Sequence, residues 1–321
     1  FARIYSLKEG KSGRNELTAF DTEGLRSIYG CEIKDFNPSD HFSAKDLQRM
    51  DRASQLCLVA VREAVTMSKL DISGLNKEKC AVSFGSTLGG MISGMEYYRQ
   101  LKKNKIDASR LLDYPLYSAG TRVCIEYGFL GPNIVMSTAC SSSNVAIGYA
   151  YDLIQNGIAD IVIAGGFDTM AEITCSGFGV LRNVSPDICR PFDKKRNGLI
   201  LGEGAACLVL ENSEHCLKRE GKIYAELMGC GMSSDAYHLT APDITGRGPA
   251  LCMQKALEHS GVDVDSVDYI NAHGTGTTHN DKAETLAIKK IFGKRAYDIP
   301  VSSTKSMHGH TLGAAGAVEA V

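Results

Sequence analysis

Residues 133–155 of the chain read NIVMSTACSSSNVAIGYAYDLIQ, and this stretch decides the fold class. Asn133 to Thr138 is a short apolar run typical of a buried strand, and Ser141 to Gln155 has the length and the apolar spacing of a helix. A tight turn that contains a cysteine separates the two segments. The stretch therefore predicts a strand that passes through a turn directly into a helix.

The same alternation of strand and helix continues on both sides of this stretch. Further strands are predicted at Cys80 to Gly85, Ile161 to Ala164 and Ala206 to Leu210, and helices at Ser43 to about Lys69, with room for a break, and at Gly90 to Lys103. Strands that alternate with helices in this way are typical of α/β proteins. The predicted fold class is therefore α/β.

A second round of alternation follows near residue 223. It predicts strands at Ile223 to Met228, Val267 to Ile270 and Pro300 to Ser303, and helices at Pro249 to His259, Asp281 to Ile291 and from Leu312 onward. In both rounds a strand runs into a Ser-Thr turn and then a helix rich in small residues, which indicates internal duplication. We expect two halves, residues 1–215 and 216–321, that pack as one body.

The composition excludes several classes of protein. Lys and Arg number 35 against 37 Asp and Glu, a formal net charge of -2, so no overall field attracts nucleic acid or anionic lipid. The eleven cysteines form neither CxxC pairs nor Cys/His clusters at zinc spacing, which predicts no metal site and mostly buried thiols in a reducing cytoplasm. The charged residues in Phe1 to Lys8 do not fit a signal peptide, so we expect a soluble, cytoplasmic protein.

Cys140 is the first candidate for chemistry. It lies on the turn before the predicted helix, where unpaired N–H groups and the helix dipole favour a thiolate over a thiol. Its own backbone N–H is a candidate donor to an oxyanion on an attacked carbonyl. Six further cysteines are interpreted as small buried thiols: Cys31, Cys57, Cys80, Cys124, Cys207 and Cys252.

Two histidines are candidates to assist this nucleophile. His273 lies in NAHGTGT, residues 271–277, and His310 ends KSMHGH, residues 305–310. Both segments follow predicted strands, and α/β proteins build their sites at the carboxyl ends of strands. The glycines of the first segment do not form a GxGxxG or P-loop pattern, so a nucleotide site is disfavoured.

Four motifs together resemble the elongating β-ketoacyl-(acyl carrier protein) synthases, which are relatives of polyketide ketosynthases. They are T-A-C-S-S-S at Thr138 to Ser143, P-F-D-x-x-R-x-G-x-x-x-G-E-G at Pro191 to Gly204, N-A-H-G-T-G-T at Asn271 to Thr277, and S-S-T-K-S-x-x-G-H-x-x-G-A-A-G-A-V-E at Ser302 to Glu319. The resemblance implies a thiolase-like α/β fold, layered α-β-α-β-α with two duplicated halves. It also implies transfer of an acyl chain to a cysteine, followed by decarboxylative Claisen condensation with a malonyl thioester.

The resemblance assigns a role to individual residues. It implies Cys140 as the acyl-accepting nucleophile, His273 and His310 as the active-site histidines, and Lys305 as the lysine that orients them. The supporting residues it implies are Glu319 and Glu284 in the polar network, and Thr275 and Thr277 against the phosphopantetheine arm. That arm belongs to the acyl carrier protein, so no cofactor of the enzyme itself is expected. The family pairs as dimers, and we expect a homodimer.

Several alternatives stay open at this point. Asp281 and Glu284 are equally well explained as acids that complement a helix dipole. For Lys305, a solvated lysine at the end of a strand is the less favoured alternative to a site role. His308 falls at a variable position of the motif, so we expect it to lie outside the chemistry.

Contact with an acidic carrier protein requires a local basic patch. Arg182 and Arg62 are the preferred candidates for this contact, ahead of Lys69, Lys102, Lys103 and Lys105.

Three functions remain in competition. The first is an active condensing enzyme, the second a non-decarboxylating acyltransferase of the same fold, and the third a catalytically silent partner in a heterodimeric ketosynthase. The retention of Cys140 favours the first. The family begins with an earlier strand and ends with a Gly-Phe-Gly-Gly loop, so we expect the chain to be part of a longer protein. Fatty acid and polyketide synthesis are both compatible with the motifs.

Overall fold

The structure is a computed structural model that describes residues 7–105 and 107–321. Most of the first eight residues, on which the expectation about a signal peptide rests, lie outside the described residues. The chain forms two compact units: unit 1 comprises Phe1–Glu32, Glu172–Gly202 and Leu227–His310, and unit 2 comprises Ile33–Ala171, Glu203–Glu226 and Thr311–Val321. The division of the sequence into halves at residue 215 stays a prediction.

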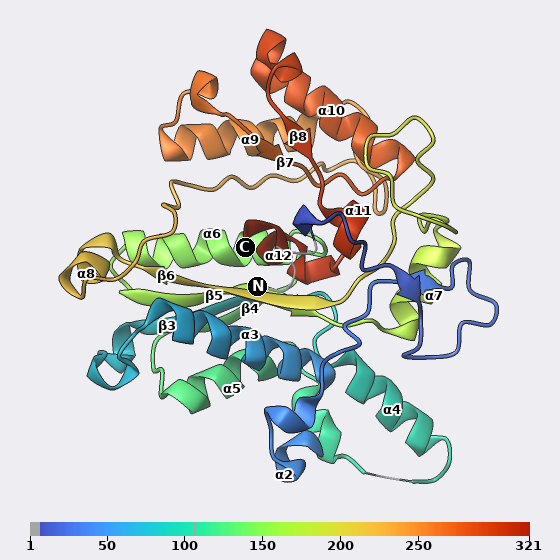
Figure 1. The fold of residues 1–321 in the computed structure, drawn as a ribbon, viewed down its shortest axis with the longest axis vertical. Coiled ribbons are helices and arrows are strands. Elements are labelled where there is room, and N and C mark those ends of the chain that lie inside the picture. The colour runs from blue at the N-terminus through green and yellow to red at the C-terminus, as the bar shows by residue number, and fades with distance from the viewer. Residues whose placement is uncertain (1–6, 106) are drawn as a thin grey trace. The chain divides into compact units, whose positions relative to one another are not determined.

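Unit 2 is built on a four-stranded sheet in the order β4-β3-β5-β6 (Figure 1). The strands are β3 at Cys80–Gly85, β4 at Asn133–Met136, β5 at Ile161–Asp168 and β6 at Gly204–Glu211. β3 runs parallel to both β4 and β5, whereas β6 is antiparallel to β5. The predicted strand at Ile161 to Ala164 is thus present and continues to Asp168.

Helices cover both faces of this sheet (Figure 1). On one face lie α3 at Arg52–Ser68 and α5 at Ser118–Tyr127, and on the other lie α6 at Ser142–Gln155 and α12 at Ala315–Ala320. The remaining helices of unit 2 are α2 at Ala44–Leu47, α4 at Met91–Leu101 and α8 at Ser213–Lys218. Because both faces are covered, every residue of β3 and β5 is buried, which explains why these strands read as continuous apolar runs.

The helix predicted from Ser43 to about Lys69 is divided into α2 and α3. Each part has its own cap: the Ser43 side chain accepts a hydrogen bond from the backbone N–H of Asp46, and the Asp51 side chain accepts one from that of Ala53. Lys69 ends α3 in the left-handed conformation at φ 54°. Capping residues in the middle of the apolar pattern therefore mark the break.

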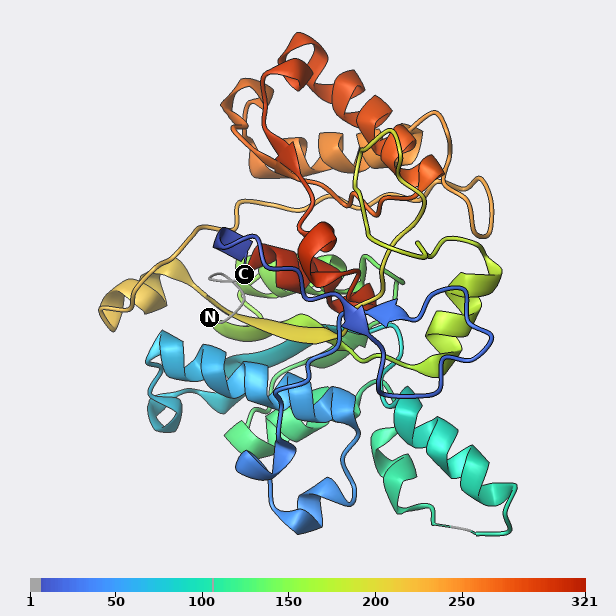
Figure 2. The ribbon, with the colours of Figure 1, turned by 45° about the vertical axis from the view of Figure 1, so that its right-hand side comes forward.

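Unit 1 contains two small sheets, and four helices whose bounds both lie among its described residues. β1 at Asn15–Glu16 pairs antiparallel with β2 at Tyr29–Gly30, and β7 at Ile270–Asn271 pairs parallel with β8 at Val301–Ser302. The helices are α7 at Glu172–Val180, α9 at Arg247–Ser260, α10 at Thr278–Phe292 and α11 at Lys305–His308. α9 and α10 pack side by side, with β7 and β8 against them (Figure 2).

The strand predicted at Ile223 to Met228 is wrong. No strand is assigned among the described residues 222–236, and the side chains of Ile223 and Met228 are about half exposed. This segment crosses from unit 2 to unit 1 after Glu226. An apolar run becomes a strand only where a neighbouring strand accepts and donates its backbone hydrogen bonds, and here no ladder forms.

Two other elements of the second half are shifted. The predicted strand at Val267 to Ile270 is reduced to the two residues of β7, which starts three residues later and ends one residue later than predicted. Val267, the predicted first residue, is instead the C-cap of a short 3-10 helix at Val264–Ser266. The helix predicted from Leu312 begins as a 3-10 helix, η7 at Leu312–Ala314, and continues as α12.

Of the six cysteines interpreted as buried thiols, Cys31, Cys57 and Cys80 are buried, whereas Cys124, Cys207 and Cys252 are only partly buried. Within the part of the chain that the structure describes, the eleven cysteines form no disulfide, and six of them are buried. No helix of residues 7–105 and 107–321 has both the length and the apolar character that crossing a bilayer requires.

Glycines bring the start of α6 into contact with the sheet. A Cβ atom at Gly85, the last residue of β3, would lie 2.2 Å from the backbone of both Ser142 and Ser143. A Cβ at Gly166 of β5 would lie 2.6 Å from the Ser143 Cβ. The first turn of α6 therefore packs directly on the backbone of β3 and β5, and no larger residue fits between them.

We expect Gly85→Ala to destabilise the protein, because its methyl group overlaps backbone atoms that cannot rotate away. The free energy of unfolding should fall by about 1–3 kcal/mol or more, as for other overpacked sites. Urea unfolding followed by circular dichroism measures the change. Gly177→Ala in α7 is the control: nothing lies within 4 Å of the added methyl, so its stability should stay at the wild-type value or rise slightly. Equal stability of the two variants would contradict the close packing.

Candidate active site

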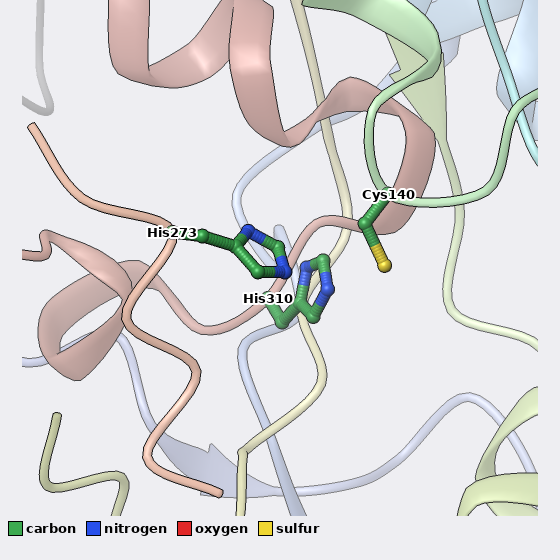
Figure 3. A group of neighbouring side chains, drawn as sticks. All are labelled: Cys140, His273 and His310. Atoms are coloured by element: carbon green, nitrogen blue, oxygen red, sulfur yellow. The ribbon is translucent and has the colours of Figure 1, made fainter. Parts of the chain in front are cut away.

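Cys140 lies on the turn between β4 and α6, as predicted. Ala139, the residue before it, has φ 53°, a left-handed conformation that is uncommon for a residue other than glycine. The Ala139 carbonyl accepts hydrogen bonds from the backbone N–H of Ser142 at 3.1 Å and from its hydroxyl at 2.6 Å. The backbone N–H of Thr138 donates to the same hydroxyl at 2.9 Å. The buried Ser142 side chain therefore holds the turn from the inside, and the half-buried thiol extends from it (Figure 3).

His273 lies on the loop between β7 and α10, and an acid of α10 binds the loop backbone. The N–H groups of His273 and Gly274 donate to the two carboxylate oxygens of Glu284 at 2.6 and 2.8 Å. Asp281 accepts hydrogen bonds from Gly276 N–H at 3.2 Å and from Phe192 N–H at 2.7 Å. The two acids are buried and bind backbone donors, so complementing the helix dipole is at most part of their role.

His310 is held by an extended segment that follows α11. Its N–H donates to the carbonyl of Ile200 at 2.7 Å, and its carbonyl accepts from Gly202 N–H at 2.9 Å. The His310 ring meets the His273 ring edge to face, with centroids 5.3 Å apart and planes at 85° (Figure 3). The structure thus brings together two histidines that are 37 residues apart in the sequence.

Lys305 begins α11 and is only 1% exposed. The alternative of a solvated lysine at the end of a strand is therefore wrong. The charge of Lys305 acts on both imidazoles, because it is among the causes that lower the pKa of His273 and of His310. A buried cation beside two histidines disfavours a second positive charge on either ring. The orienting role of Lys305 stays a prediction.

His308 belongs to the local turn around α11. One ring nitrogen lies 2.8 Å from the Gly309 carbonyl, and the other lies 2.8 Å from the Thr304 hydroxyl. Both ring nitrogens therefore lie within hydrogen-bond distance of the two residues that flank this short helix. This placement agrees with the expectation that His308 lies outside the chemistry.

Burial determines the charge state of the two central histidines. It lowers the pKa of His273 to about 3, with Lys305 adding to the effect. It also lowers the pKa of His310 well below the usual value, and the neighbouring His273 and Lys305 contribute. Both imidazoles are therefore neutral at pH 7, and each has one N–H donor and one acceptor nitrogen. A pair of neutral donors can stabilise a negative oxygen that develops during a reaction.

Thr275 and Thr277 lie on the same loop as His273. Their hydroxyls are 2.8 Å apart and form a hydrogen bond, and Thr277 is the residue before α10. The backbone carbonyl of Thr275 accepts a hydrogen bond from the Cys189 thiol at 3.3 Å. The two hydroxyls thus form a small polar group two to four residues after His273 in the sequence.

The remaining predicted residues are spread over the two units. Arg182 is exposed, follows α7 and has φ 55°. Arg62 of α3 forms a two-pronged ion pair with Glu126, with both N–O distances at 2.7 Å, and also donates to the His41 carbonyl. Glu319 lies on α12 of unit 2 and is partly buried. A role for Arg182 or Arg62 in carrier contact stays a prediction, although the Arg62 guanidinium is largely occupied.

Sequence reasoning missed the role of Arg196. Its guanidinium donates to the carbonyls of Thr277 at 3.2 Å and Thr278 at 3.0 Å, and it lies 3.7 Å from the Asp281 carboxylate. The arginine thus fastens the segment at Pro191 to Gly204 to the start of α10. The signal was present in the P-F-D-x-x-R motif, which served only as a family signature.

Sequence reasoning also missed Asp168. It ends β5, is completely buried, and accepts hydrogen bonds from the loop after β3 and from Gly313. The sequence signal for Asp168 is an acid at the end of a buried apolar strand.

An apolar cavity of about 450 Å³ lies in unit 2, between α4 and the 3-10 helix η4 at Ser109–Asp113. Its lining is Met91, Gly94, Met95, Tyr97, Tyr98, Leu111 and Tyr114. None of the site residues predicted from the sequence lines this cavity.

Comparisons with known proteins agree on one family. Residues 5–215 match the family described as "Beta-ketoacyl synthase, N-terminal domain", and residues 224–321 match "Beta-ketoacyl synthase, C-terminal domain". A 3-oxoacyl-(acyl-carrier-protein) synthase 2 of Coxiella burnetii is 41% identical, over 98% of this chain and 79% of its own length.

Solved structures of ketosynthases also resemble the chain. The ishigamide ketosynthase/chain length factor has a TM-score of 0.92 at 35% identity, over 98% of this chain and 79% of that chain. A ketosynthase bound to a hexaketide, in complex with its type II PKS acyl-carrier protein, has a TM-score of 0.91 at 28% identity, with the same coverage.

The low pKa of His273 makes a prediction about acid stability. The unfolded chain takes up a proton near pH 6.5, whereas the folded protein does so only near pH 3, so the unfolded state binds more protons in between. The free energy of unfolding should therefore decrease as the pH falls from 6.5 toward 3. Between pH 7 and pH 5 this histidine should account for a loss of about 1–2 kcal/mol.

Denaturant unfolding at pH 7, 6 and 5 tests this prediction. His273→Gln has no titrating ring, so its stability should decline less steeply over this range than that of the wild type. Identical slopes for the two proteins would mean that His273 titrates normally in the folded state.

Proposed function

Since the chain belongs to the β-ketoacyl synthase family, we propose that Cys140 accepts the acyl group and that His273 and His310 activate the second thioester. The chain is a condensing enzyme of the acyltransferase class with the thiolase-like α/β fold, as the sequence resemblance predicted. The observation that carries the assignment of residues is the pair of neutral imidazoles with centroids 5.3 Å apart, one buried and one partly buried.

The first step transfers an acyl chain to the enzyme. The Cys140 sulfur attacks the carbonyl carbon of an acyl thioester, and the carbonyl electrons move onto the oxygen. When they return, the carbon–sulfur bond to the carrier breaks, and the carrier leaves as a thiol with the proton from Cys140. A thiolate suits this step because it is both a good nucleophile and a good leaving group.

The second step forms the nucleophilic carbon. A malonyl thioester loses carbon dioxide, and the electrons of the broken carbon–carbon bond form an enolate. Hydrogen bonds from the N–H groups of His273 and His310 stabilise its negative oxygen, which requires neutral rings that are oriented in advance. The enolate carbon then attacks the acyl carbonyl on Cys140. The β-ketoacyl product leaves on the carrier, and the Cys140 thiolate that is expelled takes up a proton from solvent to restore the starting thiol.

The residues around the histidines have supporting roles in this proposal. Lys305 keeps the two imidazoles neutral, because its positive charge opposes a second one nearby. Glu284 fixes the loop that carries His273 through the two N–H groups it binds. We assign Glu319 to the same polar network, and the hydroxyls of Thr275 and Thr277 to the phosphopantetheine arm of the substrate.

The substrates are thioesters of an acyl carrier protein in fatty acid or polyketide synthesis. The arm that carries the acyl group belongs to this partner, so the enzyme requires no cofactor or metal of its own for the steps above. Exposed Arg182 is the better candidate for the carrier contact, since Arg62 is already paired with Glu126. We place the protein in the cytoplasm, which is supported by eleven cysteines that form no disulfide among the described residues.

We also propose that the halves 1–215 and 216–321 divide the chemistry. The first half contains the nucleophile, and the second contains both histidines and Lys305.

The function is tested by intact-mass analysis after incubation with an acyl carrier thioester. The wild type should gain one acyl group, which peptide mapping places on Cys140, and should release β-ketoacyl product when malonyl carrier is added. Cys140→Ala should gain no adduct. An adduct without condensation would instead indicate an acyltransferase, and no adduct on the wild type would indicate a silent partner subunit.

The two steps should respond differently to loss of a histidine. His310→Ala should still form the acyl adduct, whereas condensation should slow by about 10²- to 10³-fold, the usual cost of losing one donor to an oxyanion. Single-turnover rates of adduct formation and of product release measure the two steps separately. Equal slowing of both would argue against a role of His310 confined to the second thioester.

We propose that the protein is a homodimer. β4 is an edge strand with a partner only on its β3 side among the described residues, and large apolar side chains are exposed nearby, at Ile125 of α5 and at Leu130. Edge strands of this kind are commonly covered in an assembly.

Sedimentation velocity should show twice the mass of the 34.6 kDa chain at micromolar concentration. A stable monomer at that concentration would contradict the dimer. A monomer that dimerises only with a second, different ketosynthase chain would support the heterodimeric alternative.

A further inference from the structure

The carboxylate of Asp168 joins three separate segments of unit 2. Oδ1 accepts hydrogen bonds from the Ser86 hydroxyl at 2.8 Å, Thr87 N–H at 3.1 Å and Leu88 N–H at 2.9 Å. Oδ2 accepts from Thr87 N–H at 2.9 Å and Gly313 N–H at 2.6 Å. Asp168 is 0% exposed, so the protein itself provides this solvation of the carboxylate.

The loop that Asp168 holds touches the turn of the nucleophile. The Thr87 hydroxyl donates to the carbonyl of Ala139 at 3.3 Å, and Ala139 directly precedes Cys140. On the strand side, Ser86 N–H donates to the Met136 carbonyl at 3.0 Å, immediately before the turn. The chain of contacts therefore runs from the buried acid through residues 86–87 to both ends of the segment at 136–139.

The turn needs such support because its geometry is unfavourable by itself. A left-handed alanine at φ 53° persists only where its surroundings hold it. Ser142 holds the Ala139 carbonyl from the helix side, and Thr87 holds it from the loop side. If the loop moved, the direction of the Cys140 side chain would change with the conformation of Ala139.

We propose that Asp168 is a positioning residue for the nucleophile: its carboxylate fixes the loop at 86–88, so that the Thr87 hydroxyl holds the Ala139 carbonyl and thereby orients Cys140. Asp168 does not touch the reacting atoms in this arrangement. The proposal rests on the proposed function only in taking Cys140 as the nucleophile.

Burial raises the pKa of Asp168, and the donors around it oppose this rise because they favour the carboxylate form. All four groups that contact Asp168 are donors, and a carboxylate offers acceptors in every direction. In Asp168→Asn, the new NH₂ group would face a donor, either Gly313 N–H or the N–H groups of the loop. There is also little room for rearrangement, since a Cβ at Gly313 would lie 2.6 Å from the Thr87 nitrogen.

The test measures the reactivity of Cys140 independently of condensation. The rate of alkylation by iodoacetamide, followed at the Cys140 peptide by mass spectrometry from pH 5 to 9, is compared with the rate of acylation by an acyl carrier thioester. The variants are Asp168→Asn, Thr87→Val, which removes only the hydroxyl, and Thr87→Ser, which keeps it. Asp51→Asn is the matched control, because Asp51 is equally buried in unit 2 and accepts N–H groups of Ala53 and Ser93.

We expect Asp168→Asn to lower both rates by about 10- to 100-fold, as a displaced catalytic group does, and to change the pH dependence of alkylation. Thr87→Val should lower them in the same direction, and the double variant should be no slower than Asp168→Asn alone, because both residues act through one contact. Thr87→Ser should restore the wild-type rates. Asp51→Asn should lose stability but keep the wild-type reactivity of Cys140.

Three results would overturn the proposal: wild-type alkylation of folded Asp168→Asn, additive effects in the double variant, or equal slowing by Asp51→Asn. If Asp168→Asn does not fold, Thr87→Val and Thr87→Ser decide alone, since wild-type rates for Thr87→Val exclude the contact with Ala139. A wild type that is never acylated by the carrier thioester would reject the proposed function, whereas the alkylation series would still decide the role of Asp168.

Discussion

The close contact between the first turn of α6 and the backbone of β3 and β5 is the constraint on which unit 2 depends. Gly85 and Gly166 leave no side chain between strand and helix, so Ser142 and Ser143 rest on the sheet itself. The turn that joins β4 to this closely packed helix contains Ala139 in the left-handed region. The position of Cys140 is thus a consequence of backbone packing as much as of its own chemistry.

In unit 1, the surroundings of two histidines keep both rings neutral and hold the backbone that carries them. Desolvation lowers the pKa of both rings, of which His310 is buried and His273 partly buried, and Lys305 makes a second positive charge still less favourable. The loop of His273 is bound by Glu284, and the segment of His310 is hydrogen-bonded to Ile200 and Gly202. Buried polar groups are tolerated here because the backbone N–H groups of His273, Gly274 and Gly276 have carboxylate acceptors. Satisfied networks of this kind are rigid.

Most elements followed from local patterns. The bounds of β3 agree with the prediction residue for residue, because a strand buried on both faces reads as a largely apolar run, here interrupted only by Ser83 and ended by glycine. α6 and α10 were recognised by apolar spacing and by the polar turns before them. Ile223 to Met228 failed because the same apolar content forms a strand only beside a hydrogen-bonded neighbour, and a local pattern contains no information about that neighbour.

By itself the sequence determined the α/β class and the family, and it named the candidates for the nucleophile and the histidines, since these depend on local spacing and on motifs. The tertiary structure alone decided that His273 and His310 meet edge to face, that Lys305 is buried, and that Glu284 and Asp281 bind a loop backbone. It also assigned partners to Asp168, whose donors come from residues 80 to 145 positions away. Such contacts depend on how distant segments pack, and no local pattern of residues records that packing.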